Sequence, residues 1–234
     1  MISTLEKARK DPDSMKAKIL KVARRVFGEY GFHGTTTRLI AQETGIDIST
    51  LHYHWGDKAN LYESVILDIT DDLKSELVEV EKVIHGLPLA KRMEIAIGMV
   101  TDYLFACPEI SNLILFRYFG KTRHEAAVDF HMPEFVSDIA RSMHLSESSK
   151  DVPVEAKMKV LAMMNAIYNF ISGEEFFRSM LKLEKEDYVS RVKETLKFIL
   201  IPAFVSSEGK TGTMMGPSDE DRAGGWLWVN ERDH

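Results

Sequence analysis

The sequence TTTRLIAQETGIDISTLHYHWGDK, residues 35–58, decides the fold. Gly45 and Gly56 divide this stretch into two short segments, 38–44 and 48–55, whose apolar residues recur at helical spacing. Glycine ends helices readily because it adopts left-handed backbone conformations at little cost. Two helices of about eight residues joined by a glycine turn of three or four residues are typical of a helix-turn-helix.

Longer segments with helical apolar spacing flank this pair. Asp11 and Pro12 predict the start of a preceding helix, as its N-cap and first residue, and Gly31 and Gly34 predict its end. Asp57 is expected to cap a long following helix over 58–85. Because isolated helices as short as the central two are unstable in water, the flanking helices must support them.

The rest of the chain is expected to be helical. From Leu89 onward the apolar spacing stays helical, with no alternating strand pattern and no internal repeat. We expect helices near 89–106, 109–119, 121–144, 153–182 and 185–205. The fold class is therefore all-α, with an N-terminal three-helix helix-turn-helix domain over 1–57 and a larger C-terminal helical domain over 58–206. The glycine-rich segment 207–234 is expected to be a tail, and its Trp226–Val229 cluster to dock on the protein's own surface or on a partner.

Composition and charge limit the possible functions. The net charge is −6, divided between +3 over residues 1–60 and −9 over the remainder. A basic end on an acidic body is the asymmetry of a small nucleic-acid reader joined to a separate body. Cys107 is the single cysteine, so no intramolecular disulfide can form. The sequence has no apolar run long enough for a membrane span and no secretory signal, so we expect a cytoplasmic protein without membrane contact.

Residues 19–65 resemble the DNA-binding domain of the TetR family of transcriptional regulators. The matching elements, in order, are Val26-Phe27, Tyr30-Gly31-Phe32, Thr35-Thr36-Thr37, Ile40-Ala41, Gly45-Ile46, Thr50-Leu51, Tyr53-His54-Trp55, Lys58 and Leu61. The remainder resembles the family only in being all-helical and of similar length. The resemblance implies a homodimeric repressor that binds a near-palindromic double-stranded DNA operator and is released from it by a small molecule.

The second short helix is the expected reading element. Its apolar side chains would pack inward, which leaves the outward positions to enter a major groove. The base-contacting residues expected there are Ile48, Ser49, Thr50, His52 and Tyr53. Phosphate contacts, which position the domain without reading sequence, are expected from Thr36, Thr37, Arg38, Tyr53, His54 and Lys58.

The larger domain is expected to carry dimerisation and ligand binding, because family members pair through their last two long helices and hold an effector inside the body. Residues expected near the twofold interface are Met163, Ile167, Phe170, Val192, Leu196 and Ile199. Residues expected to line an effector pocket are Met99, Tyr103, Phe116, Phe130, Met164 and Tyr168. Because these side chains are large and apolar, we expect a lipophilic effector that moves the long helix at Gly56–Asp57; the alternative is that most of them simply fill a core.

Parts of the sequence are compatible with three other functions. Asp68, Asp71 and Asp72 have the helical spacing by which isoprenoid synthases hold magnesium, but a solvated acidic face explains them more simply. His124 and His131 leave open a metal-sensing regulator of the same fold. A helical interaction protein that binds no DNA would not explain the ordered motif. We therefore expect no catalytic residues, no metal site and no cofactor.

Overall fold

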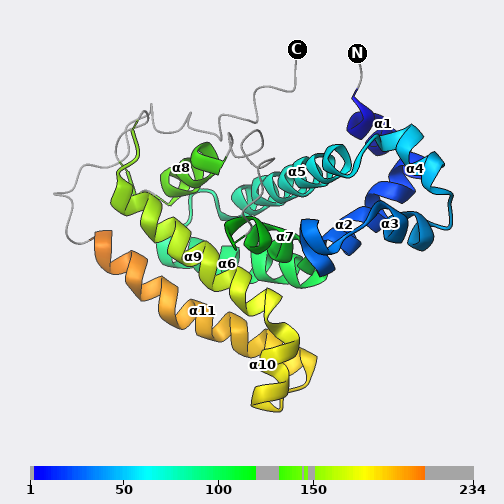
Figure 1. Ribbon diagram of the computed structural model, residues 1–234. Helices are drawn as coiled ribbons and strands as arrows, with labels where there is room; N and C mark the ends of the chain where they lie inside the picture. The colour runs from blue at the N-terminus through cyan, green and yellow to red at the C-terminus, as the bar shows by residue number, and fades with distance from the viewer. Residues whose placement is uncertain (1–2, 120–131, 144, 147–150, 209–234) are drawn as a thin grey trace.

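The structure is a computed structural model that describes residues 3–119, 132–143, 145–146 and 151–208 (Figure 1). All regular secondary structure in these ranges is helical. The helices are α1 (Thr4–Lys10), α2 (Met15–Gly34), α3 (Thr37–Thr44), α4 (Ile48–Trp55), α5 (Lys58–Ile84), α6 (Leu89–Ala106), α7 (Pro108–Phe119), α8 (Met132–Ser142), α9 (Val154–Ser172), α10 (Glu174–Leu181) and α11 (Lys185–Glu208). None of these helices is long and apolar enough to cross a membrane.

Two lobes share the long helix α5, and we call them the head and the body. The head consists of α1 to α4 and packs on the first half of α5, whereas α6 to α11 form the body around its second half (Figure 1). Helices α9 and α11 lie side by side along one face of the body, and α10 forms the tip that joins them. The all-α expectation is thus confirmed over the described part of the chain.

The head core follows the predicted apolar pattern. Helices α3 and α4 begin and end within one residue of the segments predicted from the sequence. Their inward side chains and those of α2 and α5 are at most 4% exposed: Ile19, Phe27, Ile40, Leu51, Trp55 and Leu61. Burying side chains of this size stabilises a fold by roughly 1.5–3 kcal/mol each. The two short helices are therefore held by packing on their longer neighbours.

The start of the head differs from the prediction. The N-cap of α2 is Ser14, whose hydroxyl accepts a hydrogen bond from the Ala17 amide at 3.2 Å, and Asp11 instead ends a separate helix. That helix, α1, was not predicted, although Ser3 and Glu6 form a complete capping box at its start. The prediction of Asp11 and Pro12 as a helix start was therefore wrong by three residues.

Two body helices also differ from the predicted ranges. The segment 153–182 is divided at Gly173 into α9 and α10. Helix α11 continues to Glu208, so the first two residues of the predicted tail belong to it. The described part of the predicted helix 121–144 is α8; residues 120–131 and 209–234, with the tryptophan cluster, lie outside the described residues.

A charged cluster fastens the head to the body. Asp68 of α5 is 5% exposed and pairs with the side chains of Arg9 and Arg24, each at 2.8 Å. Arg24 also pairs with Asp72 at 2.5 Å and with Glu109 at the start of α7 at 3.3 Å. A buried carboxylate with two arginine partners is not part of a solvated face, so that sequence interpretation was wrong for Asp68, whereas the side chains of Asp71 and Asp72 are partly exposed.

The contact between α2 and α7 is closer than side chains normally allow. A Cβ atom added to Gly28 would lie 2.6 Å from the Cβ and 3.0 Å from the Cα of Glu109. Gly31, at the kink in α2, has φ of +68° and lies against the Phe116 ring. Glycine at position 28 thus lets the head approach the body at backbone distance, and glycine at position 31 allows the kink.

Candidate nucleic-acid interface

The turn between α3 and α4 fixes the angle of the reading helix. Gly45 ends α3 in the left-handed conformation, with φ of +73°. Its amide donates to the Gln42 carbonyl at 3.1 Å, and the Ile46 amide donates to the Ala41 carbonyl at 3.0 Å. Such bonds satisfy the last carbonyls of a helix and stop it sharply. The predicted helix-turn-helix is therefore present, with a glycine turn of the expected kind.

Helix α4 has a buried face and an exposed face. Leu51 and Trp55 point into the head core, and the Trp55 indole donates to the Lys16 carbonyl at 3.3 Å. On the opposite side Tyr53 is 84% exposed and Ile48 is 41% exposed. Ser49 and His52 are also exposed, and Thr50 is half-buried. The structure thus brings the predicted base-contacting residues together on the outer side of α4, although Thr50 is partly covered.

His52 has a defined orientation. Its Nδ1 lies 2.6 Å from the carbonyl oxygen of Gly56, the residue that ends α4. Because a carbonyl oxygen only accepts hydrogen bonds, Nδ1 carries the proton and donates it. In the neutral ring, Nε2 is then an acceptor that faces away from this bond. That acceptor suits the amino groups that adenine and cytosine present in the major groove.

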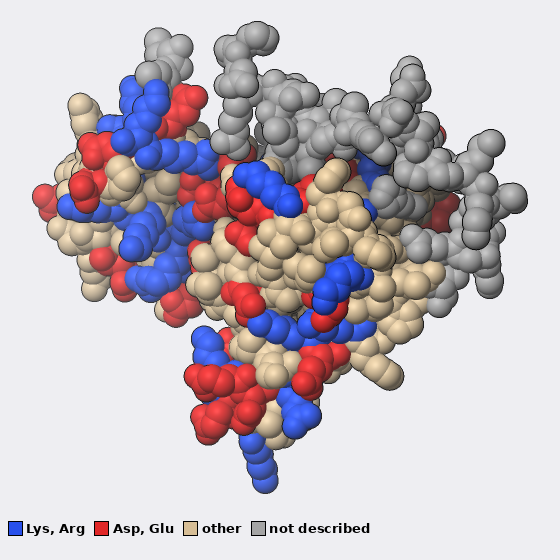
Figure 2. All heavy atoms as spheres, turned by 180° about the vertical axis from the view of Figure 1, so that it is seen from behind, with Lys and Arg blue, Asp and Glu red and all other residues tan. Residues whose placement is uncertain are grey.

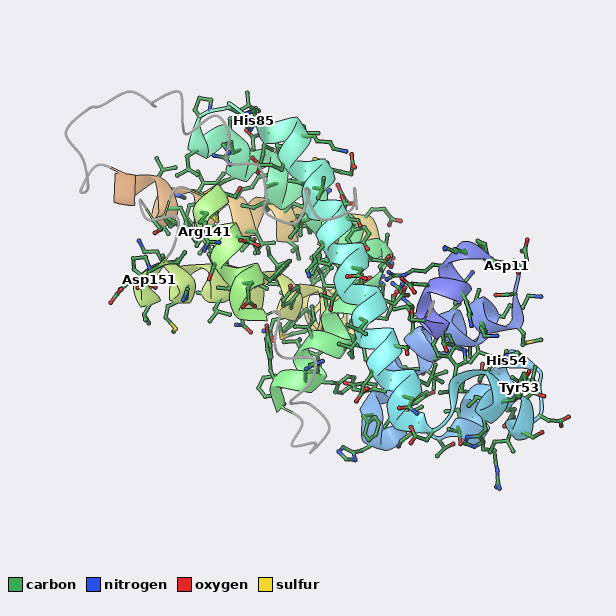
Figure 3. The ribbon with its side chains drawn as sticks, turned by 90° about the horizontal axis from the view of Figure 1, so that it is seen from above. Asp11, Tyr53, His54, His85, Arg141 and Asp151 are labelled. Atoms are coloured by element: carbon green, nitrogen blue, oxygen red, sulfur yellow. The ribbon has the colours of Figure 1, made fainter. Side chains whose placement is uncertain are left out.

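His54 is supported by Lys16, a residue that the sequence analysis missed. The Lys16 ammonium lies 3.3 Å from Nδ1 of His54 and can only donate, so Nδ1 accepts and Nε2 carries the proton. Burial, reinforced by the Lys16 charge, lowers the pKa of His54. His54 is therefore a neutral donor at pH 7. In Figure 3, Tyr53 and His54 lie in the head near the start of α5, whereas His85 lies at its far end.

The start of α3 presents a second set of polar groups. The Thr36 hydroxyl accepts from the Leu39 amide at 3.1 Å and thereby caps the helix. Arg38 is exposed and has no ion-pair partner among the described residues, whereas Thr37 is half-buried. The exposed amides of a helix start and a free guanidinium are both suited to phosphate oxygens.

Lys58 has a structural role that the sequence did not predict. Its ammonium donates to the carbonyls of Phe32 at 2.9 Å and of Thr35 at 3.0 Å, and lies 4.2 Å from the centre of the Phe32 ring. Two of the three donors of the ammonium are thus used inside the head. Lys58 therefore holds the end of α2 against α5, and its predicted phosphate contact, for which one donor remains, stays a prediction.

The charge of the head is mixed. Figure 2 shows lysine, arginine, aspartate and glutamate side chains interspersed over the head, and a mostly uncharged area across the middle of the body. Arg25, part of the basic side of α2, is neutralised by Glu43 at 2.6 Å and by Glu29 at 3.6 Å. Attraction to phosphate thus depends on a few unpaired groups such as Arg38.

The body contains an apolar cavity of about 110 Å³ between α5, α6, α8 and α9. Met164 and Tyr168 line it, as predicted from the sequence. Met99, Tyr103 and Phe116 do not, which corrects the prediction for these three. Tyr103 lies instead near Asp72 and Arg24, where burial, reinforced by the Asp72 charge, raises its pKa. Phe130 lies outside the described residues.

The residues predicted near the dimer interface are divided between interior and surface. Ile167, Val192 and Leu196 are 6%, 3% and 1% exposed and pack within the body. Met163 and Phe170 are half-buried, and Ile199 alone of the six is exposed. The three buried side chains are therefore covered within the protomer itself. The large apolar side chains exposed on α9 and α11 are Val154, Met158, Phe198 and Ile199.

The described residues include no group of three or more His, Cys, Asp or Glu side chains placed to hold a metal ion. The three aspartates weighed as a magnesium site lie beside Arg9 and Arg24. His124 and His131, weighed as metal ligands, lie outside the described residues.

A family model and curated relatives agree with this geometry. Residues 19–65 match the model described as "Bacterial regulatory proteins, tetR family". The chain is 26% identical over 154 residues to the HTH-type transcriptional repressor AcnR of Corynebacterium glutamicum, a match that covers 62% of this chain and 74% of AcnR. An HTH-type transcriptional regulator of Staphylococcus aureus (strain USA300) is 26% identical over 136 residues, which is 56% of this chain and 72% of that protein.

A solved structure shows the same fold. A TetR-like transcriptional regulator from Rhodococcus sp. RHA1 superimposes with a TM-score of 0.59 at 16% sequence identity. The superposition covers 80% of this chain and 94% of the Rhodococcus chain. Likeness in fold therefore extends well beyond the segment that matches the family model, into the body.

Proposed function

We infer that this chain, a DNA-binding transcriptional regulator of the TetR family, is a cytoplasmic repressor that a small apolar effector releases from its operator. One observation supports the proposed DNA binding. The outer side of α4 exposes Tyr53 and Ile48, two large side chains that lie outside the buried core of the head. Large exposed side chains on a rigid, well-packed element are typical of a binding surface.

The proposed reading mode divides the contacts by chemistry. Ile48, Ser49, Thr50, His52 and Tyr53 face the base edges in the major groove, where Ile48 would pack on a thymine methyl. Phosphate contacts come from Thr36, Thr37 and Arg38 at the start of α3, and from Tyr53 and the Nε2 proton of His54. The head over residues 1–57 is thus the DNA-binding unit of the proposal, and residues 58–206 are the regulatory unit.

The proposed assembly is a twofold homodimer. The apolar side chains exposed along α9 and α11, above all Phe198 at 81% and Met158 at 59%, support pairing through these two helices. Exposed apolar area on adjacent helices is typical of a subunit interface. Two symmetry-related heads then require an operator of near-palindromic half-sites.

The proposed effector site is the apolar cavity of the body. The cavity lies beside the second half of α5, and the first half of the same helix supports the head. A ligand that changes the shape of the cavity can therefore displace α5 and, with it, the reading helix α4. An effector can release DNA only if it binds better to a conformation whose heads do not fit the operator.

Two measurements test this function. Fluorescence anisotropy with genomic fragments should find a near-palindromic site that the purified protein binds far more tightly than a scrambled sequence. The affinity should fall steeply with salt, because each dimer would neutralise roughly 6–10 phosphates. Native mass spectrometry of the freshly purified protein should reveal a bound apolar compound that weakens this binding. Equal affinity for all sequences would overturn the DNA-reading part, and release by a metal ion alone would replace the effector part.

A further inference from the structure

The lining of the body cavity is almost wholly apolar, and its two charged residues lie close together. Helix α5 ends at Ile84 and α6 begins at Leu89, so the two helices run antiparallel and the last turn of α5 faces the first turn of α6. Glu81 and Arg92 come from these two turns, and Ser142 comes from the end of α8. All three residues line the cavity. The far end of the same cavity is formed by aliphatic side chains such as Leu73 and Leu104.

Arg92 is a buried cation with too few partners. Its side chain is 9% exposed. One terminal nitrogen, Nη2, donates to the carbonyl of Ser142 at 2.5 Å and to its hydroxyl at 3.1 Å. The Nε atom is buried and has no hydrogen-bond partner among the described residues. Such an unpaired donor costs free energy, because burial has removed the water that would otherwise bind it.

The nearest carboxylate does not satisfy Arg92. Glu81 Oε1 lies 3.6 Å from Nη2, beyond the length of a good hydrogen bond. Glu81 has other partners, because its Oε2 accepts from the Ser142 hydroxyl at 2.8 Å and its Oε1 lies 3.7 Å from His85. The Arg92 guanidinium therefore has a distant counter-ion and an unused donor, whereas the Glu81 carboxylate accepts a hydrogen bond of normal length.

The remaining lining is apolar and adaptable. Met93, Met143, Met163 and Met164 all face the cavity, and methionine side chains repack around guests of different shape. Tyr168 also lines the cavity; its side chain is 3% exposed and its hydroxyl has no hydrogen-bond partner among the described residues. The site thus combines an apolar chamber with one strong cationic donor and one neutral hydroxyl.

We propose that the effector is a compact carboxylic acid with an apolar body, whose carboxylate pairs with Arg92 while its body fills the chamber toward Leu73 and Leu104. This rests on the proposed function, because it assigns the chemistry of the effector site. A carboxylate matches the planar fork of a guanidinium, and it would give the unused Nε donor an acceptor once the buried Arg92 side chain turns toward the chamber. The 110 Å³ cavity is smaller than the roughly 150 Å³ cavity that accepts benzene, so a larger acid requires the methionines to move.

The test compares acids with neutral isosteres of the same shape. Isothermal titration calorimetry on the full chain measures hexanoate, octanoate and benzoate against hexanamide, octanamide and benzamide. For the best-bound pair we expect the acid to bind at least about 10-fold more tightly than its amide, since the charge-assisted pair is the stronger one. Arg92→Met should abolish this preference and leave amide binding within about threefold. Lys91→Met, at an exposed neighbouring position, should keep the preference.

Three outcomes would overturn the carboxylate proposal, the role of Arg92 or the effector site. Equal binding of acid and amide by the unaltered protein overturns the carboxylate proposal, and this comparison does not depend on any variant folding. Preference retained in Arg92→Met, with native circular dichroism, overturns the role of Arg92. If neither acids nor amides bind while the protein still binds its operator, both the carboxylate proposal and the effector site fail, and the DNA-reading function stands.

Discussion

The ammonium of Lys58 lies over the ring of Phe32, 4.2 Å from its centre, and donates a 2.9 Å hydrogen bond to the carbonyl of the same residue. This contact ties the first turn of α5 to the end of α2. A cation held by two carbonyls and a ring contributes chiefly to folding stability.

Lys58→Met should therefore destabilise the protein by about 1–3 kcal/mol, since it leaves two carbonyls without a charged donor. Urea unfolding followed by circular dichroism measures this. Lys82→Met, on the same helix but exposed and paired only with Glu79, is the matched control and should change stability by less than about 0.5 kcal/mol. Unchanged stability together with weaker DNA binding would favour the phosphate contact predicted from the sequence.

Substitutions on the outer side of α4 should alter DNA binding and leave folding intact. Tyr53→Ala should weaken operator binding by about 1–3 kcal/mol with an unchanged unfolding midpoint, because the side chain is 84% exposed. Changes at Ser49, Thr50 and His52 should shift the preferred operator sequence, measured by binding to a randomised DNA library. The same preferred sequence after all three changes would show that another element reads the bases.

The stability of the protein should depend on pH through His54. Its pKa is lowered in the folded state by burial and by Lys16, so the unfolded chain takes up a proton first as the pH falls. Above the ordinary histidine pKa of about 6.5 there is no effect, and below it stability should decrease. His54→Gln should reduce this decrease between pH 7.5 and pH 5, measured by urea unfolding. His85→Gln, at an exposed histidine, is the control. An identical pH dependence in the His54 variant would contradict the assignment.

Two glycines offer a matched test of the contact between head and body. Gly28→Ala should force α2 away from α7, because the new Cβ would lie 2.6 Å from the Glu109 Cβ. We expect lower stability, by roughly 1–3 kcal/mol, and weaker operator binding. Gly98→Ala, in α6 with open space around the added Cβ, should instead raise stability by roughly 0.5–1 kcal/mol. Similar effects of both changes on operator binding would argue against a specific role for the contact.

Pairing of subunits should depend on the exposed side of α9 and α11. Met158→Glu combined with Phe198→Glu should yield folded monomers in analytical ultracentrifugation, because both side chains are exposed in the protomer. Charges at Ile167 and Leu196, the positions predicted from the sequence, should instead unfold the protomer, since both are buried within it. Phe176→Glu, at an exposed phenylalanine of α10, is the control. A dimer that survives the first double change would place the interface elsewhere.

The sequence predicts well where local signals decide the structure. Gly45 and Gly56 fix the ends of α3 and α4, and the Asp57 side chain caps α5 as expected, accepting from the Asn60 amide at 2.8 Å. These features depend on residues a few positions apart. The outward residues of α4 follow from the same short-range periodicity.

Contacts between residues far apart in the chain could not be predicted from the sequence. Arg9 and Asp68 are 59 positions apart, and nothing in the local pattern distinguishes a paired aspartate from a solvated one. Helix α9 is apolar on more than one side, so periodicity alone could not tell that Ile167 faces the core while Met158 faces outward. Lys58 matched the family motif by identity, but its position is set by the carbonyls that end α2.

The ion pairs of Asp68 with Arg9 and Arg24 restrain how helix α5 can move relative to α1 and α2. A helix that contacts its neighbour at one point can pivot about that contact, whereas a helix held at two separated points cannot. Helix α5 is attached to α2 at Lys58 and again three turns later at Asp68. Both attachments follow the Gly56–Asp57 junction, so any movement of α5 at that junction, as expected from the sequence, must carry α1 and α2 with it. Helices α1, α2 and the first half of α5 therefore move as one unit, to which the cavity is joined through the second half of α5.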